Sequence, residues 1–191
     1  MGPEKPNKKS CIYQSCVTAS GLCVWLSCAA YLLTAYAWRE QLSVLALTPL
    51  VILVGMFPNT FPMPSNWKFT HEKITFTLSD AFVLLIACWH GAAAAVFVAG
   101  IEGFTSSRRS VRRLSSNLFS YGMMSLAAAA AAACLNAVLR YGWHEAGASK
   151  HHTFTAAAVA VLLASIVQVI LNWGLISTLI ALRHGSAILH E

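Results

Sequence analysis

The chain has 191 residues, of which 57% are hydrophobic and only 10% are charged. Thirteen Lys and Arg against seven Asp and Glu give a formal net charge of +6. Several apolar runs are too long for the core helices of a soluble protein, so the composition excludes a soluble globular domain and predicts a polytopic membrane protein. We expect the lipid bilayer, and no nucleic acid, among its partners.

Five apolar segments stand out when windows of about 20 residues are taken along the chain. In chain order they are Val17–Trp38, Leu42–Phe57 (which contains Pro49), Phe76–Phe104, Leu114–Leu139 and Phe154–Leu182. Residues 1–16 are predicted to be a basic cytoplasmic tail, and the first apolar segment is too long for a cleaved signal peptide. Pro58–Thr75 and Tyr141–His152 are predicted to be loops because they are polar, and the first also contains three prolines, which cannot continue a helix.

The Phe76–Phe104 segment decides the topology, because it either crosses once or turns at Gly91. A single crossing divides the Lys and Arg residues seven to six, whereas a turn divides them ten to three. The positive-inside rule favours the turn. Each arm then has about 14 residues, or roughly 21 Å, which is short for a bilayer core of about 30 Å. Neighbouring helices must therefore bury the arms, or the membrane must thin locally.

We therefore predict an all-α integral membrane bundle of six transmembrane helices over residues 17–185, with a short helical hairpin turning at Gly91. Both ends are expected in the cytoplasm, and residues 186–191 are expected to form a cytoplasmic junction to a further or separate partner domain. Two small-residue stripes are candidates for close helix packing. They are Ala95, Ala99 and Gly103 in one helix, and Ala129, Ala133 and Ala137 in the next. The alternative is that these alanines are only apolar filler.

Ionisable groups in transmembrane segments are rare and are treated first as functional candidates. Asp80 and Glu102 each lie eleven residues from Gly91, which places them at equal depth near the cytoplasmic face. The predicted inner-face polar cluster consists of Asp80, Glu102, Asn117, Asn172, Arg108, Arg109, Arg112 and Arg113. One interpretation is structural: Asp80 caps its helix and Glu102 pairs with an arginine. The other is that the cluster couples the membrane domain to a cytoplasmic partner.

The outer face offers a second candidate site. A shallow pocket for a small-molecule ligand is predicted from the aromatic and hydrogen-bonding side chains Tyr31, Trp38, His90, Asn136, Arg140 and Trp143. The alternative is the belt of Trp and Tyr expected at any membrane interface. No metal site is expected at His144, Glu145, His151 and His152, which lack regular ligand spacing, and the six cysteines have no CxxC pattern. No catalytic motif is present, so we expect neither an enzyme nor a cofactor.

Several short blocks resemble a known membrane module. They are Ile74–Gly91, the alanine-rich arm ending in Gly100-Ile-Glu-Gly103, the arginine-rich loop after it, Asn117-Leu-Phe, Leu171–Ile180 and Arg183–Gly185. Together they resemble the N-terminal membrane region of bacterial signalling proteins that carry cytoplasmic HD-GYP or GGDEF domains for cyclic-di-GMP turnover. More distantly, they are similar to the six-helix S-components of energy-coupling-factor transporters. The chain departs from the signalling pattern by having Trp89-His90 before Gly91, where a Gly-Pro type of turn is typical, and by ending at Glu191.

The resemblance implies a bacterial inner-membrane sensor, a non-catalytic input module that binds a ligand and acts on a cytoplasmic signalling domain. The alternative implied by the S-components is a solute-binding subunit that works with energising transporter subunits. No phosphohydrolase or cyclase motif is present in the chain, so neither of those activities is expected of it.

Overall fold

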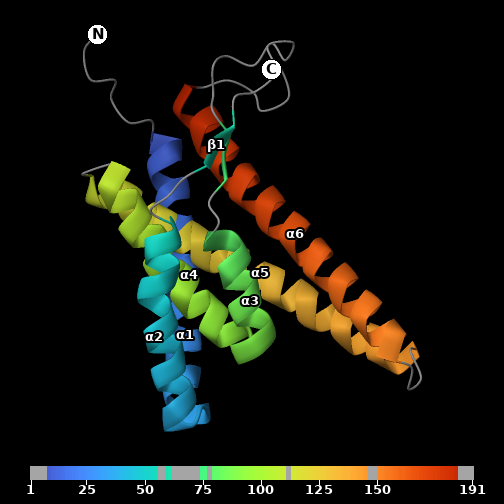
Figure 1. Ribbon diagram of the computed structural model, residues 1–191. Helices are drawn as coiled ribbons and strands as arrows, with labels where there is room; N and C mark the ends of the chain where they lie inside the picture. Colours follow the sequence, from blue (N-terminus) through green and yellow to red (C-terminus); the bar gives the residue numbers. More distant parts are fainter. Residues whose placement is uncertain are drawn as a thin grey trace.

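The computed structural model describes residues 8–55, 59–61, 74–76, 79–110, 113–145 and 150–184. These residues form helices α1 (Lys8–Ala35), α2 (Trp38–Gly55), α3 (Ser79–His90), α4 (Ala92–Ser110), α5 (Leu114–Glu145) and α6 (Lys150–His184), and strands β1 (Asn59–Phe61) and β2 (Ile74–Phe76) (Figure 1). The prediction of an all-helical bundle is confirmed apart from the two short strands.

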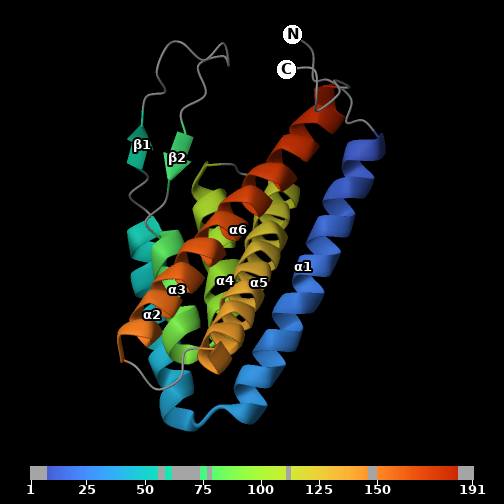
Figure 2. The ribbon, with the colours of Figure 1, turned by 90° about the vertical axis from the view of Figure 1, so that its right-hand side faces the viewer.

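The helices run alternately in opposite directions, so that their junctions gather at two ends of the bundle (Figure 2). The start of α1, the strands, the α4–α5 junction and the end of α6 lie at one end, and the other three junctions lie at the opposite end. Helix α5 packs against α1, α4 and α6, and α4 also packs against α1, α2 and α3. Helices α4 and α5 are therefore the centre of the fold.

Four of the described helices, α1, α2, α5 and α6, are long and apolar enough to cross a membrane, and α3 is a shorter apolar helix. Their outward faces are strongly apolar: Leu33 is 72% exposed, Leu162 is 61% exposed and Ile170 is 63% exposed. Apolar surface of this extent would be unstable in water but is matched to lipid. The chain is therefore described below as a membrane protein.

The chain breaks at Gly91, as predicted. Helix α3 ends at His90, α4 begins at Ala92, and Gly91 between them has a φ of 85°, a left-handed conformation that glycine adopts without steric cost. The two arms have 12 and 19 residues rather than about 14 each, because α4 continues through the first arginines to Ser110.

Other boundaries differ from the prediction. Helix α1 begins at Lys8, so the predicted tail is helical from that residue onward. The predicted Pro58–Thr75 loop contributes β1 and part of β2, which pair antiparallel with Asn59 opposite Phe76 and Phe61 opposite Ile74. Aromatic and β-branched residues favour such strands. The prediction treated the whole segment as irregular because of its prolines.

The two small-residue stripes have different outcomes. In α4, Ala95 and Ala99 are fully buried, so the first stripe lies in a helix contact. In α5, Ala133 and Ala137 are exposed, so the second predicted stripe is wrong. The buried face of α5 is instead formed by Ala127, Ala128, Ala131, Ala132 and Leu135. A uniform alanine run marks no face by hydrophobicity, because one residue already turns the helix by about 100°.

Helices α1 and α5 cross at a glycine pair that sequence analysis did not identify. A Cβ atom built on Gly21 would lie 2.3 Å from the Cα of Gly122, and one built on Gly122 would lie 2.8 Å from the carbonyl oxygen of Val17. Both glycines thus allow the backbones to touch, as small residues do in membrane helix pairs. Next to this crossing, the Trp25 indole N–H donates to the Phe97 carbonyl at 2.9 Å and joins α1 to α4.

Candidate functional site

Three helices meet at the carboxylate of Glu102. This side chain is only 3% exposed on α4, and the Ser79 hydroxyl at the start of α3 donates to its Oε1 atom at 3.2 Å. Gly55, the last residue of α2, leaves the necessary room, because a Cβ there would lie 2.5 Å from the same oxygen. The Glu102 carboxylate can therefore occupy this position only because residue 55 of α2 is a glycine and has no side chain.

A second carboxylate joins this group to α6. Gln168 is 2% exposed in the middle of α6, and its Nε2 atom donates to Oδ1 of Asp80 at 2.8 Å. The Asp80 carboxylate is near enough to act electrostatically on Glu102. The oxygen of the same amide, Gln168 Oε1, is buried without a hydrogen-bond partner. We call the buried residues Ser79, Glu102 and Gln168, together with the half-buried Asp80, the buried polar cluster.

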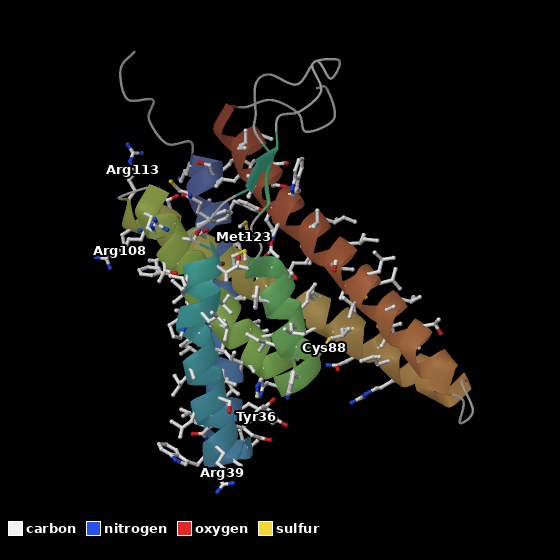
Figure 3. All side chains as sticks on the ribbon, viewed as in Figure 1. Tyr36, Arg39, Cys88, Arg108, Arg113 and Met123 are labelled. Carbon is white, nitrogen blue, oxygen red and sulfur yellow. The ribbon has the colours of Figure 1, made fainter. Side chains whose placement is uncertain are left out.

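The predicted ion pair between Glu102 and an arginine is wrong for Arg108, Arg109 and Arg113, because these three are exposed and none of them forms an ion pair with Glu102. Arg108 and Arg113 point away from the bundle (Figure 3). Arg108 lies six residues, or about 9 Å, further along α4, where a long cationic side chain reaches water or lipid headgroups. Arg112 lies outside the described residues.

Neither asparagine of the predicted inner-face cluster forms a hydrogen bond with Glu102. Asn117 is 3% exposed, and its Oδ1 accepts a hydrogen bond from the Ser107 hydroxyl at 3.0 Å, which ties the end of α4 to the start of α5. Asn172 lies one turn beyond Gln168 on α6, and its Oδ1 is buried without a hydrogen-bond partner. Of the predicted residues, the structure thus brings Asp80 and Glu102 together, and it adds Ser79 and Gln168.

At the opposite end, the tip of the α3–α4 hairpin is tied to the α1–α2 turn. The Tyr36 hydroxyl donates to the carbonyl of His90, and the Tyr36 ring packs edge-to-face against Tyr31 with ring centroids 6.0 Å apart. Tyr36 is labelled beside this tip in Figure 3. It was absent from the predicted outer pocket, although it lies between two of the residues that were predicted there.

The remaining outer residues are less closely connected. Trp38 is 70% exposed and Tyr31 is 57% exposed, while Asn136 and Arg140 are exposed on α5. Within the described part of the chain, no hydrogen bond joins Asn136 or Arg140 to His90. The side chain of Trp143 lies outside the described residues. The hydrogen bond between Tyr36 and His90 thus joins the hairpin tip to the α1–α2 turn, and the ligand pocket stays a prediction.

Sulfur and imidazole ligands do not gather in the described residues. No group of three or more His, Cys, Asp and Glu residues is placed to hold a metal ion there, and all six cysteines are free thiols. The side chains of His144, Glu145, His151 and His152 lie outside the described part.

The buried polar cluster is therefore the strongest candidate site: two carboxylates, an amide and a hydroxyl that three helices, α3, α4 and α6, place inside an apolar bundle. No family model, curated protein or solved structure matches the chain.

Proposed function

We propose that this protein is a non-catalytic sensory module of the bacterial inner membrane, which binds a ligand and acts on a cytoplasmic signalling partner. The observation that carries the proposal is the hydrogen-bonded contact of α6 with α3 through Gln168 and Asp80, beside the contact of α3 with α4 through Ser79 and Glu102. Polar contacts of this kind are costly inside lipid and mark functional positions more often than lipid-facing residues do.

The same helices connect this cluster to the end of the bundle that carries the arginines. On α4, buried Glu102 is followed within two turns by exposed Arg108 and Arg109. A helix is stiff over this distance, so a shift of α4 at Glu102 moves the arginines with it. This geometry supports a module in which helix positions, rather than chemistry, transmit the signal.

A transport component is the second candidate function. The favouring observation is again the buried carboxylate of Glu102 beside the half-buried carboxylate of Asp80, because buried ionisable groups also mark solute and ion pathways. The two functions differ in the partner that each requires at the arginine-bearing end: a signalling domain for the sensor, and energising subunits for the transporter.

Photo-crosslinking distinguishes these partners. A photoreactive phenylalanine analogue is introduced at Arg109 in the full chain within its source cells, with Leu26 as the control because it is 53% exposed on the apolar face of α1. We expect Arg109 to crosslink to a signalling protein identified by mass spectrometry, and Leu26 to crosslink to none. Adducts with an ATPase or its coupling protein support the transporter. If Arg109 gives no crosslinked adduct, or if Arg109 and Leu26 give the same adducts, the protein does not act through a partner at the arginine-bearing end, and the proposal is rejected.

The proposed topology has six spans with both ends in the cytoplasm, and it predicts opposite locations for Ala37 and Arg109. In a background without the six native cysteines, an impermeant maleimide should label Ala37→Cys in intact spheroplasts. It should label Arg109→Cys only after permeabilisation. Both residues are exposed at helix junctions or ends, so access to reagent is not limited by packing. If Phe76–Phe104 crossed only once, both cysteines would label from the same side.

A further inference from the structure

No described cation compensates the charge of Glu102 in the buried polar cluster. This carboxylate is 3% exposed, its hydrogen-bond partner is the neutral hydroxyl of Ser79, and no described Lys or Arg pairs with it. The second carboxylate, Asp80, adds negative charge nearby. A buried carboxylate such as Glu102 in an apolar surrounding needs a compensating positive charge or a proton.

An independent observation comes from the amide of Gln168. The side chain is 2% exposed and its Nε2 is committed to Asp80, which leaves Oε1 buried beside the cluster with no donor. The opposite amide orientation would place this oxygen against a carboxylate oxygen, which is repulsive. Buried polar atoms are nearly always satisfied, so this orphan acceptor, on the amide that is bonded to Asp80, is available to ligate a cation.

The available atoms define the chemistry of that group. Carboxylate, amide and hydroxyl oxygens are ligands for hard cations, and no thiolate or imidazole belongs to the cluster. Calcium takes about six to eight oxygen ligands, more than a cluster of four side chains supplies. Magnesium keeps much of its water, which a desolvated helix bundle does not accommodate. A small monovalent cation has the lowest dehydration cost of the three.

We propose that Asp80, Glu102 and Gln168 form an intramembrane Na⁺ site, with Gln168 Oε1 as its neutral ligand. The site ties α3, α4 and α6 to one ion, while Gly55 of α2 preserves the space beside Glu102. This inference rests on the contacts of the cluster, and it stands whether or not the chain acts on a signalling partner.

Thermal unfolding of the purified full chain in detergent tests the proposal. The melting temperature is measured in NaCl and in choline chloride at equal ionic strength, with CaCl₂ as a further arm. A ligand that binds only the folded state raises stability with the logarithm of its concentration. We expect such a rise with Na⁺. No rise with Na⁺, or a rise with Ca²⁺ alone, would overturn the assignment.

Variants locate the ion. Glu102→Gln and Gln168→Leu should lose the Na⁺-dependent rise in melting temperature. Gln14→Leu is the control, because Gln14 is a half-buried glutamine that also has an orphan amide atom, but that atom is the donor Nε2, which cannot ligate a cation. Gln14→Leu should keep the full rise. A rise unchanged in both cluster variants would place the ion elsewhere and reject the site.

Equilibrium binding of ²²Na⁺ gives a readout that does not depend on melting. Wild-type protein should bind the isotope in a form displaced by unlabelled Na⁺ and not by choline. Gly55→Ala keeps every proposed ligand and favours the helix, but its methyl group would lie 2.5 Å from Glu102 Oε1. This variant should fold and bind ²²Na⁺ more weakly. Full binding by Gly55→Ala, or none by the wild type, contradicts the proposal.

Discussion

Replacing Gly21 by valine is expected to push α1 away from α5 and to lower the free energy of unfolding by about 3 kcal/mol, the upper end of ordinary overpacking costs. The reason is that even a methyl group at Gly21 would lie 2.3 Å from the Cα of Gly122 and 2.3 Å from its carbonyl oxygen. Backbone atoms cannot rotate out of the way, so the two helices must separate. Thermal unfolding in detergent, with the fraction of monodisperse protein, measures the loss.

Gly174→Val is the matched control for that experiment. Gly174 is an exposed glycine within α6, and no atom lies within 4 Å of a Cβ built there. The same valine introduced into a helix should therefore leave the melting temperature close to that of the wild type. Equal melting of the two variants would show that α1 and α5 do not approach as closely as described.

Replacing Ala99 by leucine is expected to lower the free energy of unfolding by about 1–3 kcal/mol, because Ala99 is fully buried on α4 and three extra carbons have no space there. Ala133→Leu, the same change in the alanine run of α5, should be nearly silent because Ala133 faces outward. Chemical or thermal unfolding of both proteins in one detergent makes the comparison. A larger loss at Ala133 would mean that the buried face of α5 has been assigned one residue out of place.

The broad fold was predictable from the chain because lipid imposes simple rules on it. Apolar length located the helices, and the distribution of Lys and Arg was enough to break the Phe76–Phe104 segment at Gly91. The face of a helix was predictable only where the pattern contained a marker. On α4, Gly103 and Glu102 interrupt the apolar pattern, whereas Ala127–Ala133 contains seven identical side chains and marks no face.

The candidate site was predictable in part. Asp80 and Glu102 were identified because carboxylates are rare in apolar segments, and their equal distance from Gly91 placed them at one depth. Their partners were not identified. Gln168 is 88 residues from Asp80 in sequence, and Ser79 is 23 residues from Glu102, so only the packing of α6 and α4 against α3 brings them together. A lone glutamine in the apolar Phe154–Leu182 segment was the signal that could have been used.

The length of α3 also governs how the chain enters the membrane during synthesis. With 12 residues, or roughly 18 Å, α3 is too short to remain in a bilayer alone, and α4 is not among the four long apolar helices. The buried face of α4 is covered by α5, which leaves the ribosome later. We therefore expect the hairpin to stay with the insertion machinery until α5 emerges. A chain stopped at Ser110 should be degraded, and one that continues to Glu145 should persist.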